Sequence, residues 1–180
     1  MANEILVKQG TAVCWADETD YNNANSGIAR THQIDLTSLA TTKARQGAKA
    51  DLTATRAAGY AVLAGIEMDV APTAGTVVDI FWSASASGTA GTGNAGGASG
   101  ADAAYKDGEE AEWVQQLIHI GSVVLTADAA PVVQVQCVNP YFSPPTRYGM
   151  PVVRNVGGQA FEGDAVEMFV ALVPVVDESQ

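Results

Sequence analysis

The segment from Tyr60 to Val70 carries an apolar residue at every second position, which makes it the clearest strand signal in the chain. These residues are Tyr60, Val62, Ala64, Ile66, Met68 and Val70. A period of two places all of them on one face of a β-strand, so the chain must build a sheet with a buried face. A turn at residues 72–75 and a β-branched, aromatic run at 76–83 follow. We therefore predict a β-hairpin here.

Other segments of β-type composition lie on both sides of this one. They comprise residues 4–8, 11–15, 32–39, 118–126, 132–138, 150–155 and 165–176. Residues 109–117 instead have the spacing of a short helix with acidic residues in its first turn. About eight or nine strands, one helix and no repeated strand–helix unit are typical of an antiparallel β-sandwich or jelly roll. We predict a mostly β fold with an extended N-terminal segment.

The length of 180 residues suits a single domain with a substantial core. Residues 1–45 have the character of an extended arm or of outer strands, and residues 46–180 that of a jelly-roll-like β-sandwich domain. Residues 85–104 consist mostly of Gly, Ala, Ser and Thr, which offer too few bulky side chains to pack a core. We expect this segment to be a long flexible loop.

Charge excludes some classes of partner. Only 16% of the residues are charged, and 9 basic against 20 acidic side chains give a net charge of −11. A neutral surface suits contacts between subunits, because a buried unpaired charge is costly. Phosphate binding needs basic patches, which this chain lacks, so we expect no nucleic-acid partner. Its acidity also disfavours binding to anionic membranes.

The sequence shows neither a signal peptide nor a long uninterrupted apolar run. We expect a protein made in the cytoplasm that spans no membrane. Cys14 and Cys137 lie within apolar segments and are predicted to be reduced, buried thiols. Within residues 132–138, alternation places Val135 and Cys137 on one face of a strand and the two glutamines on the other.

Gly91, Gly93 and Gly96 satisfy the G-x-G-x-x-G pattern of dinucleotide sites. A working site needs the third glycine to open a helix whose amides hold the pyrophosphate. Here the glycine-rich loop simply continues, and no P-loop lysine follows. We expect no cofactor.

Metal ligands are scarce, because His32 and His119 are the only histidines and neither has a ligand spacing. Acidic residues crowd one region: Asp102, Asp107, Glu109, Glu110 and Glu112. They do not follow the twelve-residue calcium loop, and a solvated acidic face at a helix start is the favoured interpretation. We predict no metal site.

The sequence has no G-x-S-x-G elbow and no cysteine with an evident base, so we expect no catalytic nucleophile. A glycosidase needs only two carboxylates, and any acidic chain offers them. Sugar sites usually add exposed aromatic residues, whereas aromatics make up 7% of this chain. We predict a protein that is not an enzyme and keep glycoside hydrolysis as the remaining catalytic hypothesis.

The segment 141–149, YFSPPTRYG, combines three aromatic residues, an arginine and two prolines. It is either a rigid crossover that caps the end of the sandwich or a contact between subunits, where Tyr and Arg are common anchors. Both roles are compatible. Our candidate interface residues are Tyr141, Phe142, Arg147, Tyr148, Trp15, Ile5 and Val7.

Several segments of this chain resemble small structural proteins of tailed bacteriophages. They are GTVVDIFWSASASGTAGTGNAGGASGADAAY (75–105), IHIGSVVLTAD (118–128), YFSPPTRYGMPVVRN (141–155) and DAVEMFVALVPVVDE (164–178). The resemblance spans roughly residues 60 to 180 and is one of composition and order. It implies a capsid decoration (cement) protein, a β-sandwich or jelly roll on the outer surface of a virion.

This resemblance also implies partners. Such proteins contact the major capsid protein and one another, commonly as trimers, and brace the shell against internal DNA pressure. An N-terminal arm that pairs with a neighbour's strand edge would gain backbone hydrogen bonds with little demand on sequence. The alternative is a tail or head-fibre jelly-roll module that binds a host carbohydrate or receptor through Tyr141, Phe142 and Tyr148.

Overall fold

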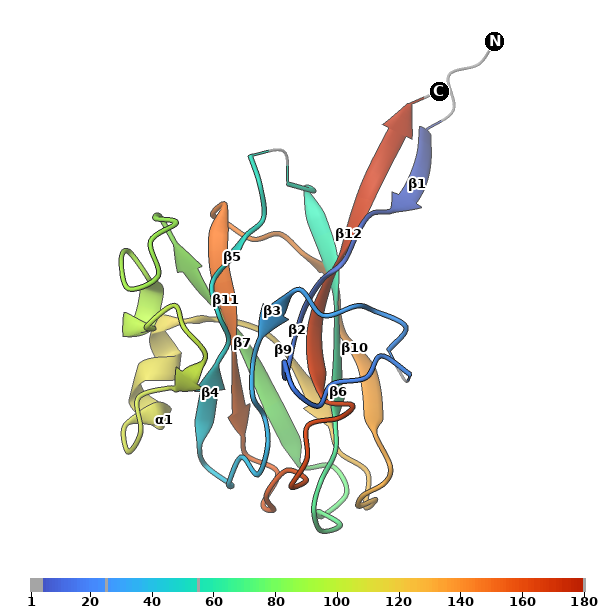
Figure 1. The fold of residues 1–180 in the computed structure, drawn as a ribbon, viewed down its shortest axis with the longest axis vertical. Helices are drawn as coiled ribbons and strands as arrows, with labels where there is room; N and C mark the ends of the chain where they lie inside the picture. The colour runs from blue at the N-terminus through green and yellow to red at the C-terminus, as the bar shows by residue number, and fades with distance from the viewer. Residues whose placement is uncertain (1–4, 25, 55, 180) are drawn as a thin grey trace.

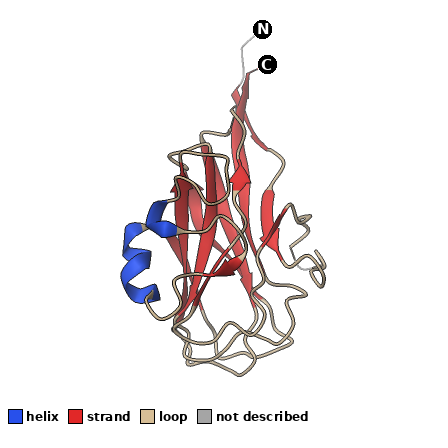
Figure 2. Ribbon diagram, turned by 60° about the vertical axis from the view of Figure 1, so that its left-hand side comes forward, coloured by secondary structure: helices blue, strands red, loops and turns tan. Residues whose placement is uncertain are grey.

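The computed structural model describes residues 5–24, 26–54 and 56–179, and it forms two packed β-sheets (Figures 1 and 2). The first sheet has the order β10 (Gln134–Phe142), β6 (Gly59–Ile66), β12 (Phe169–Ser179), β2 (Val13–Ala16) and β3 (His32–Gln33), and β1 (Ile5–Gln9) also pairs with β12. The second has the order β8 (Ala103–Ala104), β4 (Ala44–Gln46), β11 (Tyr148–Asn155), β7 (Val77–Ser85) and β9 (Ile118–Val124), and β5 (Ala50–Asp51) also pairs with β11. Every pair except β2–β3 is antiparallel.

The connectivity of the eight main strands is that of a jelly roll. In chain order these strands are β2, β4, β6, β7, β9, β10, β11 and β12. The first pairs with the last, the second with the seventh, the third with the sixth and the fourth with the fifth. Pairing of β12 with β6 and of β11 with β7 completes the two sheets. This double Greek key confirms the predicted fold class.

A short helix, α1 (Glu110–Trp113), and two 3₁₀ turns, η1 (Ala95–Gly97) and η2 (Val114–Gln116), lie beside the second sheet (Figure 2). The predicted helix at 109–117 is thus confirmed in position. Tyr105 packs with Val114 and Leu117 in a small apolar cluster that attaches this layer to Phe81 on β7.

The main core fills the space between the sheets. Trp82 lies at its centre, with its ring 5.7 Å from those of both Trp15 and Phe142. The side chains predicted from the alternation at 60–68 all reach this core, whereas Val70 follows the end of β6 and is 52% exposed. The alternating pattern therefore identified the buried face but overran the strand.

The predicted hairpin between residues 60–70 and 76–83 is wrong, because β6 and β7 belong to different sheets. The segment between the end of β6 and the start of β7 is long enough to cross from one sheet to the other. Met68, in this segment, is fully buried and forms an isolated β-bridge with Phe161. Each strand keeps its apolar face toward the common core. Period-two alternation predicts which face of a strand is buried but not which strand pairs with it.

The segment 85–104, predicted as a flexible loop, is folded and held by a partly buried cation. The Lys49 ammonium donates hydrogen bonds to Ser85 Oγ (2.9 Å), Ser87 O (2.9 Å), Thr89 O (2.6 Å) and Thr92 O (3.0 Å). Partial burial lowers the pKa of Lys49. Polar groups therefore order a segment that has few bulky side chains to do so.

Residues 1–45 are predicted from the sequence to form an extended arm or outer strands. In the structure they include β1, β2 and β3, and β4 spans residue 45. Strands β2 and β4 belong to the jelly roll, because they pair with β12 and β11. The part of the N-terminal region that leaves the body is β1 (Figure 1).

Candidate assembly site

A two-stranded ribbon projects from one end of the sandwich (Figure 1). It consists of β1 and the end of β12, paired from Gln9↔Val175 to Ile5↔Ser179. The pairing of β12 with β6 stops at Val175, and its pairing with β2 stops at Leu172. Beyond Val175, β1 is therefore the only partner of β12 within the described residues. We call this ribbon the arm.

Both long edges of the arm are open. Strand β1 pairs only with β12, and residues 176–179 of β12 pair only with β1, within the part of the chain that the structure describes. A two-stranded ribbon is marginally stable by itself in water. Unpaired N–H and C=O groups along its edges form a template for a strand from another chain.

The edge of the sandwich between β9 and β10 is closed by side-chain amides. Gln136 accepts from the Val124 N–H (3.1 Å) and donates to its carbonyl (2.6 Å). Gln134 accepts from the Thr126 N–H (2.8 Å), and Asn139 donates to the Ile120 carbonyl (2.9 Å). These amides bind backbone groups of β9 and its continuation at three positions, Ile120, Val124 and Thr126. A continuous ladder with a strand from another molecule is therefore interrupted at this edge.

This arrangement reverses the predicted phase of β10. Gln134 is buried, whereas Val135 is 41% exposed and Cys137 is exposed. The prediction that both cysteines are buried is therefore wrong for Cys137. It holds for Cys14, where burial raises the thiol pKa to about 11.

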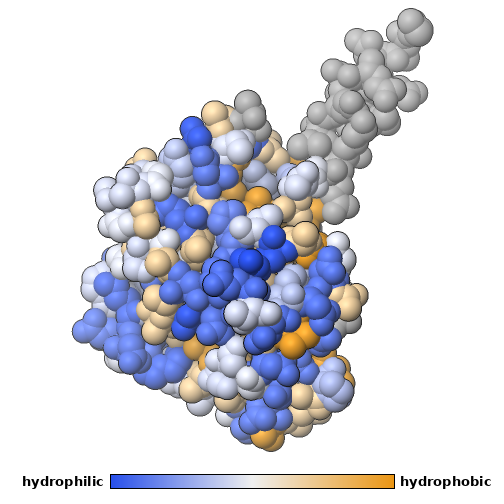
Figure 3. All heavy atoms as spheres, in the orientation of Figure 1, coloured by the Kyte–Doolittle hydropathy of each residue, from blue (hydrophilic) through white to orange (hydrophobic). Residues whose placement is uncertain are grey.

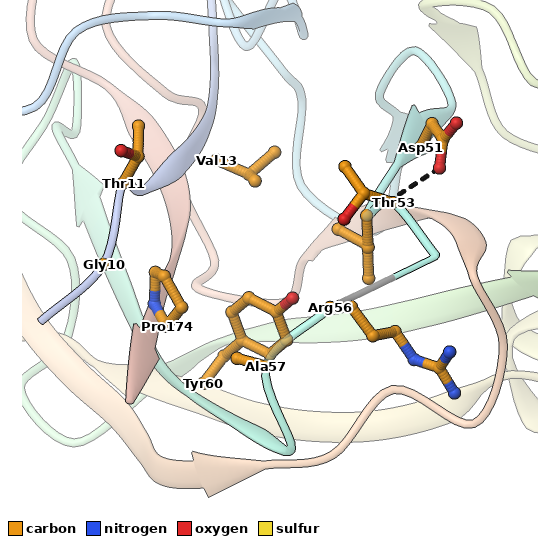
Figure 4. Close-up of a pocket in the computed structure, with 10 residues that line it drawn as sticks. Gly10, Thr11, Val13, Asp51, Thr53, Arg56, Ala57, Tyr60 and Pro174 are labelled. Atoms are coloured by element: carbon orange, nitrogen blue, oxygen red, sulfur yellow. Dashed lines mark hydrogen bonds between the residues drawn. The ribbon is translucent and has the colours of Figure 1, made fainter. Parts of the chain in front are cut away.

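A cavity of about 270 Å³ lies at the base of the arm (Figure 4). It is lined by Gly10, Thr11, Val13, Asp51, Leu52, Thr53, Arg56, Ala57, Tyr60 and Pro174. Figure 4 shows Gly10, Thr11 and Pro174 on one side, Asp51, Thr53 and Arg56 on the other, and Tyr60 between them. Gly10 and Pro174 are also joined by a backbone hydrogen bond of 3.0 Å where the arm begins.

Two charged side chains line the cavity, Asp51 and Arg56, and they differ in their ion pairing. Asp51 accepts two hydrogen bonds from the guanidinium of Arg147, at 2.7 and 2.6 Å, which lower the pKa of that carboxyl group. Arg56 is exposed and forms no ion pair within the described residues. The cavity thus presents one unneutralised cation in a chain of net charge −11.

The outer face of the first sheet carries an apolar cluster of Cys14, Ala16, Phe169 and Ala171, against which Tyr21, Ile28 and Leu63 pack. On the β10 side of this sheet Val135, Cys137 and Tyr141 are exposed. Cys137 pairs with Leu63, and the Tyr141 ring lies at Gly59. The face of the molecule seen in Figure 3 is mostly hydrophilic, with small separate apolar patches.

The predicted interface residues divide into three groups. Tyr141 is 59% exposed, Arg147 is exposed and Tyr148 is half-buried, so these three can reach a partner. Trp15 and Phe142 belong to the core at 0% and 7% exposure, and neither can contact a partner in the folded state. Sequence marks both as aromatic residues of β-type segments but does not tell which face of the strand they occupy.

Ile5 and Val7 lie in β1, opposite Ser179 and Asp177, and their side chains fall outside the described residues. The sequence therefore indicated one strand of the arm. It did not indicate the second strand or the cavity. The sequence does carry a signal for the base of the arm. Gly10 interrupts the apolar run at the N-terminus and Pro174 the one at the C-terminus, and these two runs lie side by side in the structure.

One cluster resembles hydrolytic chemistry in its residue types. Ser122 Oγ donates to Asp79 Oδ1 (2.7 Å) and lies 3.1 Å from His119 Nε2. A nucleophilic serine needs its proton directed at the histidine, which the carboxylate in turn orients. Here the serine proton points at the aspartate, so this order is not met.

Three of the five crowded acidic residues are engaged with cations. Asp102 forms two hydrogen bonds of 2.7 Å with Arg45, and both Asp107 and Glu110 pair with Lys43. Among the described residues, no group of three or more His, Cys, Asp or Glu side chains is placed to hold a metal ion.

The third glycine of the G-x-G-x-x-G pattern serves packing. Gly96 has a φ of 61°, and a Cβ there would lie 2.5 Å from the Tyr105 hydroxyl. The turn that follows Asn94 is a three-residue 3₁₀ turn. Such a turn is too short to present the amides of a helix N-terminus to a pyrophosphate.

Comparisons with models of protein families, with curated proteins and with solved structures find no match for this chain. In the described part of the chain, no helix has the length and apolar character needed to cross a membrane. The function must therefore be inferred from the arm, the cavity and the closed sandwich edge.

Proposed function

We propose that this chain is a bacteriophage capsid decoration protein, a non-enzymatic virion component on the outer surface of the shell. It binds the major capsid protein and other copies of itself and stabilises the lattice through these contacts. The jelly-roll fold and the segments that resemble tailed-phage structural proteins support this proposal.

The observation that carries the proposal is the contrast between the arm and the body. Side-chain amides close part of the β9–β10 edge, whereas both edges of the arm are open within the described residues. Proteins normally protect open strand edges against unwanted pairing. An edge left open on a projecting ribbon is suited to a dedicated partner strand.

Binding to undecorated heads of the encoding phage tests the proposal. Purified chain is mixed with the heads, and bound copies and the temperature of DNA release are measured. We expect the full chain to bind and to raise the release temperature. Removal of residues 1–9 deletes β1 and should abolish both effects, whereas removal of residues 1–4 retains β1 and is the matched control.

Circular dichroism of the core tryptophans would show that both truncated chains remain folded. Equal binding by the chain without residues 1–9 would refute the role of the arm. Failure of the full chain to bind heads would refute the decoration function itself.

A second candidate function is recognition of a host carbohydrate by a tail or head-fibre module. The 59% exposure of the Tyr141 side chain favours it, because sugars stack on exposed aromatic rings. Burial of Phe142 removes one of the three aromatics predicted for that site. Binding of the isolated chain to a glycan array, lost in Tyr141→Ala, would support this function over decoration.

A further inference from the structure

We propose that the cavity at the base of the arm receives the arm of a neighbouring copy of this chain. This inference rests on the homo-oligomeric part of the proposed function and names the surface that joins the copies. The contact joins the arm of one copy to the cavity of another. Two copies that exchange arms form a two-fold dimer, and copies joined head to tail form a closed ring when the rotation between them permits.

Charge favours this occupant. Residues 5–9 and 175–179, the two strands of the arm, contain one lysine, Lys8, and two acids, Asp177 and Glu178. The arm is therefore net acidic. Arg56 supplies an exposed positive charge at the cavity that no described residue pairs with, because Arg147 already neutralises Asp51. Two copies of net charge −11 repel one another elsewhere, so complementary charges at this contact set its position.

The cavity also offers apolar walls. Leu52 is 4% exposed and Tyr60 3% exposed, and half-buried Val13 and Ala57 complete the lining with Pro174. The arm sequence, ILVKQ paired with VVDES, contains five apolar residues among its ten. Burial of a few of these in the cavity adds to the backbone pairing that its open edges allow.

A chain cannot fill its own cavity with its own arm. Gly10 and Pro174 line the cavity and also mark the start of the arm, and from there the arm points away from the body (Figures 1 and 4). The occupant must therefore come from another molecule. Arm and cavity lie at the same end of the sandwich, so a ring of copies can satisfy every cavity at once.

A charge-exchange experiment on the purified full chain tests this inference without any capsid. Sedimentation velocity measures the dissociation constant of the oligomer for the wild type and for Arg56→Glu. We expect the substitution to raise this constant by about tenfold or more, because one attraction becomes a repulsion. Combining R56E with Asp177→Lys and Glu178→Lys makes the cavity acidic and the arm basic. The attraction between them returns with its signs exchanged, so association should be restored.

Arg30→Glu is the matched control, since Arg30 is exposed, lies outside the cavity and makes the same change in net charge. It should leave association within about twofold of the wild type. Arg56→Gln, which removes the charge without reversing it, should have an intermediate effect and serves if R56E does not fold.

Three outcomes would overturn the inference: a wild-type chain that stays monomeric, equal effects of R56E and R30E, or no recovery in the combined variant. Each leaves the proposed binding to the capsid standing if the full chain still binds heads. Conversely, a ring that forms in solution but does not bind heads would confirm the contact between copies and reject decoration.

Discussion

At the scale of single residues, polar side chains hold the parts of this fold that apolar packing does not reach. Lys49 binds four oxygens of a segment with few bulky side chains, and Trp15 donates its indole N–H to the Ala48 carbonyl at 2.7 Å. Sequence alone did not reveal these contacts, because their partners lie in other strands and loops. Composition correctly marked residues 85–104 as poor in core-forming side chains but not as ordered by a lysine.

Glu67 is a residue at which the fold opposes ionisation. Its side chain is 4% exposed, and burial followed by the nearby Glu167, Asp164 and Glu162 raises its pKa. A carboxyl group with a raised pKa in the folded state contributes stability below its unfolded pKa, about 4.3. That contribution is lost as the pH rises through the folded pKa.

Glu67→Gln should therefore stabilise the protein at pH 7, by about 1 kcal/mol. The gain should vanish near pH 4, where the wild-type carboxyl group is also protonated. Urea unfolding at both pH values measures it, with exposed Glu112→Gln as the control for net charge. A destabilised E67Q at pH 7 would contradict the account of this site.

At the scale of strands, alternation predicts which residues share a face but not where that face points. At 60–68 the apolar face and the core coincide. In β10 the order is reversed, because Gln134 and Gln136 use their amides to close the edge beside β9, which leaves Cys137 exposed. Hydrophobicity alone cannot predict which face of β10 is buried, since that face depends on where the neighbouring sheet ends.

Gln136→Val should open the edge at β9. Both backbone groups of Val124 would lose their partner, so we expect the variant to fold but to aggregate faster through edge pairing. Light scattering during storage at 37 °C is the measurement. Gln115→Val on the exposed η2 turn adds the same apolar surface without touching an edge, and equal aggregation of the two variants would count against the edge-closing role.

At the scale of the whole molecule, the sequence predicted the fold class and part of the candidate site. The number and spacing of β-type runs indicate a jelly roll, and the character of the first residues predicts an extended arm or outer strands. The pairing of β1 with the end of β12 joins opposite ends of the chain, and the cavity unites five separate segments, at Gly10–Val13, Asp51–Thr53, Arg56–Ala57, Tyr60 and Pro174. Local patterns do not contain contacts of this kind.

The claim that the arm attaches this protein to an assembly is tested most directly by cryo-electron microscopy of the particle that carries the chain. We predict copies at regular positions on the capsid lattice, with β1 and the end of β12 paired to a neighbouring chain or lodged in its cavity. Density only at a tail or fibre tip, or copies on the lattice whose arms touch nothing, would contradict the account.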